Sequence, residues 1–190
     1  VSMLRMPSTG LHSTPARTNG VMVIEVMGAQ GSLDSPLYSG MAGRVVSDSD
    51  SGDSHNIHRI GETILNRLKK GKPYSIVVVA EGIQTDGRKR AAEYIAQEIE
   101  YETGIETRET VLGYIQRGGS PTPFDRNLST RMGGHATELI GQRAVRADGI
   151  TLKEIEIASA PLEEIAGKLK LVTEDNDLVV QGRRMGICFG

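Results

Sequence analysis

The stretch V-M-V-I-E-V-M-G at Val21–Gly28 is a nearly continuous apolar run that ends in glycine. A strand buried on both faces of a sheet has this pattern, because neither face meets water. A second run of this kind, S-I-V-V-V-A-E-G, lies at Ser75–Gly82, and T-R-E-T-V-L-G-Y-I at Thr107–Ile115 is the third expected strand. Burial on both faces is typical of parallel sheets, so these stretches predict the centre of one.

Helical patterns separate these strands. Apolar residues recur at helical spacing between the first two strands, at Ile57, Ile60, Ile64, Leu65 and Leu68. A second helix is expected over residues 90–101, and Gly104 marks its end. Its inward-facing residues are expected to be Ala92, Ile95 and Ile99. Strands that alternate with helices predict an α/β fold, here a three-layer Rossmann-like domain with a largely parallel sheet.

A third helix is expected after the loop Q-R-G-G-S-P, which follows the third strand. Thr122 is expected to cap this helix, with Pro123 in its first turn and Asp125 completing a variant of the capping box. The helix is expected to end at about Ile140. Its expected buried residues are Phe124, Leu128, Met132, Ala136 and Leu139.

The length of 190 residues predicts one domain or slightly more. Residues 1–20 are turn-rich and are expected to form an irregular lead to an α/β domain over residues 21–190. Short helices are expected at 161–170 and 177–185. The run V-V-S-D-S-D-S-G-D-S within residues 29–56 is expected to form a mobile surface loop.

Composition and missing motifs exclude several functional classes. A net charge of −2 and only 4% aromatic residues, with no Trp, argue against a nucleic-acid binder. The single cysteine, Cys188, excludes a disulfide framework and a four-Cys metal site. The four His form no H-E-x-x-H pattern, and His55 and His58 lack an obvious third ligand, so no metal site is expected. No apolar run has the length of a membrane span or a signal peptide, so we expect a cytoplasmic protein.

Polar residues and glycines follow all three expected strands, where ligands bind in open parallel sheets. Expected at this edge are Met27, Gly28, Glu81, Tyr114, Gln116, Arg117, Gly118 and Gly119. Arg117, followed by two glycines, suits an anion, because a guanidinium and closely approaching backbone N–H groups both donate hydrogen bonds. Glu81 suits sugar hydroxyls as an acceptor. The structural alternative is that the glycines form turns, Arg117 is a surface charge and Glu81 caps a helix.

Three of these stretches resemble the second half of the 6-phosphofructokinase family. They are V-I-E-V-M-G at 23–28, I-V-V-V-A-E-G at 76–82 and, most specifically, E-T-R-E-T-V-L-G-Y-I-Q-R-G-G-S-P-T-P-F-D-R at 106–126. The resemblance implies the phosphofructokinase fold in part. It also implies a glycolytic, allosteric homotetramer that transfers a phosphoryl group to the 1-hydroxyl of fructose 6-phosphate, from ATP or pyrophosphate with Mg²⁺.

The resemblance also implies roles for single residues. Met27 and Gly28 match the loop that lies against the sugar, and Glu81 matches the carboxylate that binds sugar hydroxyls. Arg108 and Arg117 match the two arginines that hold the 6-phosphate. These residues would make 21–190 a sugar-phosphate-binding domain.

Four further positions follow from the same resemblance. Tyr114 stands where many members have a phosphate-binding His, and Lys70 and Lys72 match lysines that bind the phosphates of an allosteric effector. Arg17 is the candidate for an arginine that contacts the transferring phosphate, although Gly20 holds the aligned place.

The donor-binding half of the family, with its G-G-D-G and T-I-D-N-D motifs, has no counterpart here. We therefore expect a C-terminal segment that contains neither the ATP site nor the Mg²⁺ site, and that is inactive without the N-terminal half. Three alternatives stay open: a non-catalytic sugar-phosphate-binding or regulatory module, a segment of a pyrophosphate-dependent enzyme, and a flavodoxin-like scaffold with structural glycines.

The spacing of the two phosphate-binding arginines predicts a shared site. Arg108 opens the third expected strand and Arg117 lies nine residues later, so an extended chain separates their Cα atoms by up to about 30 Å. One chain then cannot close both guanidinium groups on one phosphate. We expect a second subunit to supply one of them in a homo-oligomer.

Overall fold

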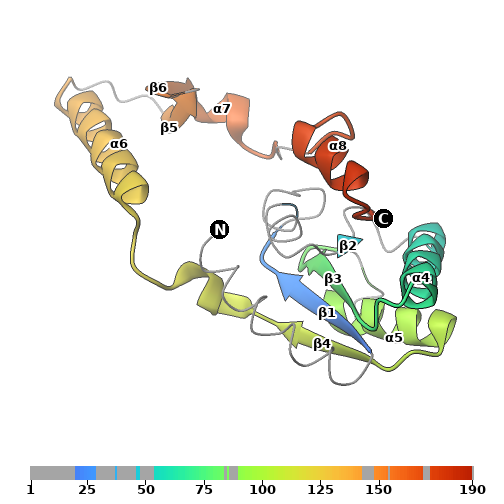
Figure 1. The fold of residues 1–190 in the computed structure, drawn as a ribbon. Coiled ribbons are helices and arrows are strands. Elements are labelled where there is room, and N and C mark those ends of the chain that lie inside the picture. The colour runs from blue at the N-terminus through green and yellow to red at the C-terminus, as the bar shows by residue number, and fades with distance from the viewer. Residues whose placement is uncertain are drawn as a thin grey trace. The chain divides into compact units, whose positions relative to one another are not determined.

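The computed structural model describes most of the chain as two compact units (Figure 1). The described residues are 20–28, 37, 46–47, 54–83, 85, 90–142, 148–153, 155–168 and 172–189. The first unit consists of Val1–Gly118 and Lys170–Gly190, and the second consists of Gly119–Leu169.

A four-stranded parallel sheet forms the centre of the first unit. Its strands, in spatial order, are β2 (Val46–Ser47), β3 (Ser75–Ala80), β1 (Val21–Val26) and β4 (Thr107–Val111). The predicted parallel sheet is therefore confirmed. The short strand β2 was not predicted, and it lies in the stretch expected to be a loop.

The two central strands are buried along their whole length, as their apolar runs predicted. On one face, Val21, Val23, Val77 and Val79 pack in a cluster with residues of the helices α4 (Ser54–Lys69) and α5 (Ala91–Thr103). On the other face, Met22, Ile24, Val26, Ile76 and Val78 form a second buried cluster. Both helices that the sequence predicted between the strands are confirmed.

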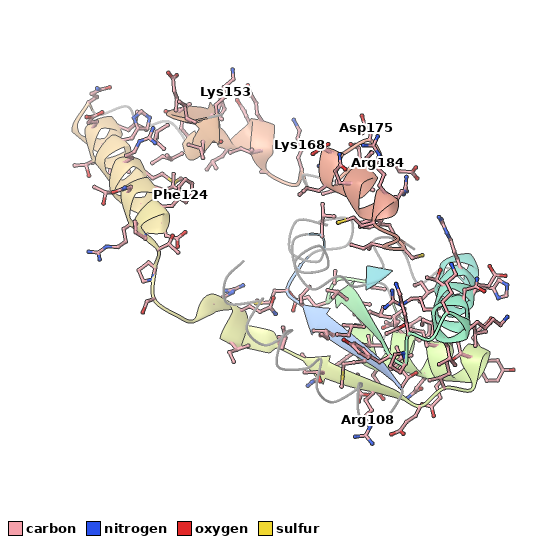
Figure 2. The ribbon with its side chains drawn as sticks, in the orientation of Figure 1. Arg108, Phe124, Lys153, Lys168, Asp175 and Arg184 are labelled. Atoms are coloured by element: carbon pink, nitrogen blue, oxygen red, sulfur yellow. The ribbon has the colours of Figure 1, made fainter. Side chains whose placement is uncertain are left out.

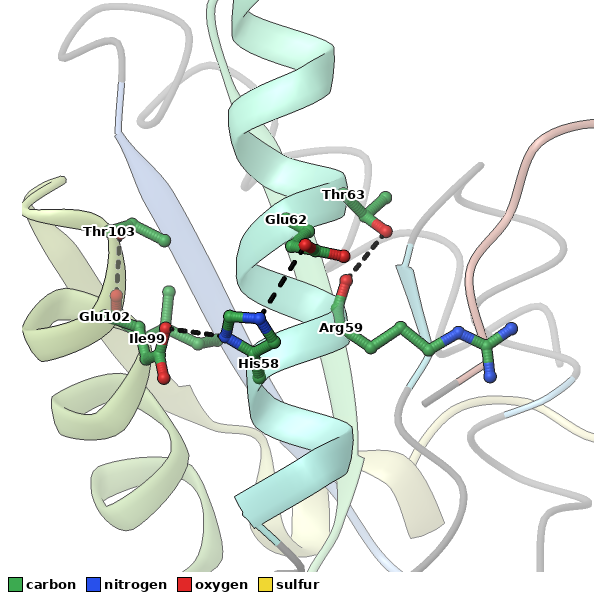
Figure 3. A network of polar contacts seen from close by, with 7 residues as sticks. All are labelled: His58, Arg59, Glu62, Thr63, Ile99, Glu102 and Thr103. Carbon is green, nitrogen blue, oxygen red and sulfur yellow. Dashed lines mark hydrogen bonds and ion pairs between the residues drawn. The ribbon is translucent and has the colours of Figure 1, made fainter.

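The helices α4 and α5 approach closely near Gly61. A Cβ atom at this glycine would lie 3.4 Å from Cγ2 of Thr103, in van der Waals contact. At the exposed edge of the same contact, His58 Nδ1 lies 3.2 Å from Glu102 Oε2 and His58 Nε2 lies 3.7 Å from Glu62 Oε1 (Figure 3). Exposed pairs of this kind contribute little to stability, so the apolar cluster beneath them holds the helices together.

The first helical turn of α5 is held by a residue from the centre of the sheet. Glu25 of β1 is only 7% exposed, and its Oε2 accepts a hydrogen bond from the Ala92 N–H at 2.9 Å. Arg90, at the N-cap position, makes no side-chain capping bond. Glu25 therefore takes over the capping role, with its negative charge at the positive end of the helix dipole. At the other end, Gly104 ends the helix in the left-handed conformation, as predicted.

The third predicted strand is shorter than expected. Thr107–Ile115 was predicted to be extended, but β4 ends at Val111 and Gly113–Arg117 forms the 3₁₀ helix η1. The chain leaves the extended conformation at Leu112, which has right-handed helical torsion angles, and the φ of 53° at the next residue, Gly113, lies in the left-handed region. The prediction was wrong for the last residues of this range.

The described residues of the second unit form one long helix, a hairpin and a single helical turn. These are α6 (Pro123–Gly141), the antiparallel strands β5 (Asp148–Lys153) and β6 (Glu156–Pro161), and α7 (Leu162–Ile165). The start of α6 is confirmed, with the full capping box between Thr122 and Asp125. The hairpin was not predicted. Of the helix expected at 161–170, the described residues form only α7, and residues 169–170 lie outside the described part of the chain.

The burial predicted for α6 is not observed. None of its residues is buried, and Phe124 is 67% exposed. Leu128, Met132, Ala136 and Leu139 are only partly buried. The helix forms where its sequence predicted, but within the described residues nothing covers its apolar side fully.

The last helix, α8 (Asp177–Arg184), is confirmed close to its predicted bounds. Asn176 Oδ1 caps it by accepting a hydrogen bond from the Leu178 N–H at 2.9 Å. Val179 of this helix packs with Leu37, Ile187 and Phe189 in a separate apolar cluster. Across the part of the chain that the structure describes, no helix is long and apolar enough to span a membrane.

The capping box of α6 predicts a pH-dependent helix start. The Asp125 carboxylate accepts hydrogen bonds from the Thr122 backbone N–H at 2.9 Å and from its hydroxyl at 2.8 Å, and these bonds lower the Asp125 pKa below its ordinary value of 3.8. A lowered pKa in the folded state stabilises the helix start above the ordinary value, and this stabilisation is lost as the pH falls through the lowered pKa. NMR chemical shifts of residues 123–127 should show the first turn fraying below pH 3.8. In Asp125→Asn this pH dependence should vanish, and its persistence would assign it to another group.

Candidate functional site

The carboxyl ends of β1 and β3 are joined by backbone hydrogen bonds. The Glu81 N–H donates to the Val26 carbonyl at 2.9 Å, and the Gly82 N–H donates to the Gly28 carbonyl at 3.0 Å. The turn after β3 therefore lies directly beside the turn after β1. The Glu81 side chain is exposed at this edge. Its carboxylate is free to accept hydrogen bonds from hydroxyl groups.

Gln116 joins η1 to the same edge. Its Oε1 accepts a hydrogen bond from the Met27 N–H at 3.1 Å, and its Nε2 donates to the Gly113 carbonyl at 3.2 Å. The Leu112 N–H donates to the Glu25 carbonyl at 3.2 Å just before this helix. One side chain thus fixes η1 on one side and the peptide after β1 on the other. The sequence placed Gln116 at this edge but did not show this bridging role.

Tyr114 and Arg117 lie together on η1. The guanidinium carbon of Arg117 is 5.6 Å from the centre of the Tyr114 ring, and both side chains are exposed. A cation above an aromatic ring is attracted to it by about 0.5–1 kcal/mol at an exposed site. The backbone N–H groups of the two following glycines were expected to donate to an anion. The Gly118 N–H already donates to the Ile115 carbonyl, so it is not available for this role.

Arg108 is not brought to this edge. It is the second residue of β4 and pairs with Met22 near the amino end of β1, whereas Arg117 follows the carboxyl end of β4. Its Nε and Nη2 atoms lie 2.8 and 2.6 Å from Glu106 Oε1, and its side chain points away from the sheet (Figure 2). Arg108 therefore lies near the amino end of β4, and Arg117 lies beyond its carboxyl end. The extended chain that the sequence predicted between them is not observed, because Gly113–Arg117 is helical.

Lys70 and Lys72 also lie away from this edge. Both are exposed in the turn between α4 and β3, at the amino end of the sheet. The Lys72 N–H donates to the Arg67 carbonyl at 3.0 Å, and Arg67 Nε donates to Ser75 Oγ at 3.2 Å. With Arg67 and Lys69 in the last turn of α4, four cationic residues occur in this turn and the helix end before it. Arg17, the remaining candidate, lies outside the described residues.

The edge formed by β1, β3 and η1 has the groups to bind a polyhydroxylated anion. Glu81 provides an acceptor for hydroxyls, Arg117 provides a cation, and Tyr114 provides a hydroxyl and a flat ring. Among the residues that the structure describes, no group of three or more His, Cys, Asp or Glu residues could hold a metal ion.

Comparison with known proteins identifies the relatives of this sequence. The family model described as phosphofructokinase matches residues 8–140. The chain is 71% identical over 187 residues to ATP-dependent 6-phosphofructokinase 3 of Bacteroides thetaiotaomicron, and the match covers 95% of this chain and 53% of that protein. An ATP-dependent 6-phosphofructokinase of Spirochaeta thermophila is 39% identical over 201 residues, with the same coverage. The chain therefore spans about half the length of these curated relatives.

Solved structures show the same relationship. The phosphofructokinase of Saccharomyces cerevisiae superposes with a TM-score of 0.73 at 25% identity, over 85% of this chain and 22% of that one. A pyrophosphate-dependent phosphofructokinase from Nitrosospira multiformis superposes with a TM-score of 0.66 at 24% identity, over 92% of this chain and 47% of that one, which supports the fold alone.

Proposed function

The chain belongs to the phosphofructokinase family, and from this premise we propose that it is the C-terminal part of an ATP-dependent 6-phosphofructokinase and binds fructose 6-phosphate. The observation that supports this most is the edge at which Gln116 joins η1 to the peptide after β1, next to the turn that contains Glu81. There an acceptor for hydroxyls and a cation for a phosphate lie on the same sheet edge. A sugar phosphate requires both.

The proposed roles follow from the chemistry of each side chain. Glu81 accepts hydrogen bonds from sugar hydroxyls, while its charge would repel a phosphate. Arg117 binds the 6-phosphate from its position over Tyr114. Met27 and Gly28 present the backbone against which the sugar lies.

We propose that Arg108 serves the sugar site of a neighbouring subunit. Its position near the amino end of β4, away from the edge at which Arg117 lies, supports a site that two subunits complete. A two-fold pairing of subunits would bring Arg108 of one chain to Arg117 of the next. This arrangement makes the enzyme a homo-oligomer whose sugar affinity depends on its assembly.

Two further proposals concern phosphate groups. The relatives named above are called ATP-dependent, which favours ATP over pyrophosphate as the donor. We place the ATP and Mg²⁺ sites in the part of a phosphofructokinase that this chain does not span, because the G-G-D-G and T-I-D-N-D motifs of the donor-binding half have no counterpart in this sequence. Lys70 and Lys72, with Arg67 close by, are the proposed contacts for the phosphates of an effector.

The proposed compartment is the cytoplasm.

Calorimetric titration of the chain with fructose 6-phosphate tests the proposal, with fructose as the uncharged control. Fructose 6-phosphate should bind and fructose should not, and Arg117→Ala should weaken binding about tenfold, the loss of one charged hydrogen bond. Arg184→Ala, an exposed arginine on α8, is the matched control.

A coupled assay should find no turnover from the chain alone, since loss of a general base costs about 10²–10⁴-fold by itself. Equal binding of fructose, or none of the sugar phosphate, would refute the proposed site.

A further inference from the structure

A carboxylate is buried in the otherwise apolar strand β1. Glu25 is only 7% exposed, and every other residue of the strand is apolar. Side chains alternate along a strand, so Glu25 points to the same face as Val21 and Val23, which pack with residues of α4 and α5. An apolar residue would fill this position without the cost of removing a charge from water. The carboxylate therefore needs a role that an apolar side chain cannot perform.

The capping of α5 does not by itself require a residue from the sheet. The Ala92 N–H donates to Glu25 Oε2 at 2.9 Å, but a Ser, Thr, Asp or Asn at the N-cap would satisfy this helix start locally. The N-cap position holds Arg90, which makes no side-chain capping bond. A local cap leaves the helix start free to move relative to the sheet, whereas a cap from β1 ties the two together. The bond to Glu25 thus fixes where α5 begins.

The segment from Glu81 to Ala92 is held at both ends by adjacent residues of β1. At its beginning, the Glu81 N–H donates to the Val26 carbonyl at 2.9 Å, and at its end the Ala92 N–H donates to the Glu25 carboxylate. Ile83 and Ala92 are buried in one apolar cluster. Loosening the start of α5 therefore loosens the packing of Ile83, which lies two residues after Glu81.

We propose that Glu25 is a positioning residue that orders Glu81 for the hydroxyls of the sugar phosphate. This inference rests on the proposed function and adds a residue that does not touch the ligand. Glu25 is too deeply buried to reach a sugar, so it acts through the start of α5 and the segment that leads back to Glu81. An acceptor that is already ordered loses less conformational freedom on binding, which strengthens affinity.

A double-mutant cycle between Glu25 and Glu81 tests the proposal. Glu25→Met removes the acceptor and nearly keeps the length of the side chain. In calorimetry it should weaken fructose 6-phosphate binding about tenfold, the loss of one hydrogen bond to a charged group. In a Glu81→Ala background the same substitution should change the affinity less than about twofold, because the side chain that it positions is already gone. The affinity for inorganic phosphate, which requires only Arg117, should be the same in all four chains.

Two controls separate the bond from the position in the fold. Glu25→Gln keeps an acceptor oxygen for the Ala92 N–H, so its sugar affinity should stay within about threefold of the wild type. Glu93→Met makes the same chemical change at a partly buried residue in the first turn of α5, and its affinity should be normal.

Hydrogen exchange measures the link between the two ends of the segment directly. In Glu25→Met the Glu81 and Gly82 amides should exchange about tenfold faster, because the segment opens more often. In the wild type, saturation with fructose 6-phosphate should slow exchange of the Ala92 amide, since coupling between two positions is reciprocal. This second measurement needs no variant, so it also decides the matter if Glu25→Met does not fold.

Three outcomes would overturn the proposal. They are equal losses of sugar affinity in both backgrounds, unchanged exchange at Glu81 and Gly82 in Glu25→Met, and an Ala92 amide that does not respond to bound sugar. If the wild-type chain does not bind fructose 6-phosphate, the proposed function is refuted. Exchange at Glu81 and Gly82 in Glu25→Met then still shows whether Glu25 holds this segment.

Discussion

Glu25→Ala is expected to destabilise the chain by about 2–4 kcal/mol in urea unfolding followed by circular dichroism, because it removes a buried acceptor and leaves a cavity. The Glu25 carboxylate is 7% exposed and accepts the Ala92 N–H at 2.9 Å. Without it, the first turn of α5 has a buried donor with no partner. The negative charge that complements the helix dipole is lost as well.

Glu25→Gln is the matched control for this prediction. Glutamine keeps an acceptor oxygen at the same length, while the charge is lost and the second oxygen becomes an NH2 donor, so the cost should fall to about 1 kcal/mol. Glu93→Ala removes another carboxylate from the first turn of α5, and this residue is only partly buried. Its cost should stay within about 0.5 kcal/mol. If Glu25→Ala is no more costly than Glu93→Ala, the buried carboxylate does not hold the helix start.

The elements that the sequence predicted are those whose pattern is local and complete. β1 and β3 are buried on both faces, so their apolar runs alone predicted this burial, without knowledge of the elements packed against them. The start of α6 was predicted because Thr122 and Asp125 form the capping box within one turn. The hairpin β5–β6 was missed because its strands are half-exposed and lack a clear alternation of apolar and polar residues.

The position of several candidate site residues was also predictable from the sequence. The rule that ligands bind at the carboxyl ends of parallel strands placed Glu81 and Gln116 near Met27 correctly. The sequence did not predict the contacts that fix this edge. Glu25 and Ala92 are 67 residues apart, and Met27 and Gln116 are 89 residues apart. No local pattern marks either pair, because only the folded sheet brings the partners together.

The bridging geometry of Gln116 has a direct consequence for the proposed sugar site. Both ends of its amide are used, one by the Met27 N–H and the other by the Gly113 carbonyl. The first bond holds the peptide proposed to lie against the sugar, and the second holds the helix that contains Arg117. A loss of this side chain should therefore disturb the sugar contact and the phosphate contact together.

We expect Gln116→Met to weaken fructose 6-phosphate binding more than tenfold in calorimetry, since an unsatisfied backbone donor alone costs about 1–3 kcal/mol and each 1.4 kcal/mol is tenfold in affinity. Methionine has nearly the same length and shape, so packing is preserved while both hydrogen bonds are lost. Gln116→Glu keeps an acceptor for Met27 but sets a carboxylate against the Gly113 carbonyl, so its affinity should fall between those of the wild type and Gln116→Met. Gln181→Met on the exposed side of α8 is the control and should bind normally.

Hydrogen exchange of the Met27 amide should accelerate in Gln116→Met, because its acceptor is gone. Faster exchange at Met27 with unchanged sugar affinity would show that this bridge holds the sheet edge and does not position the ligand.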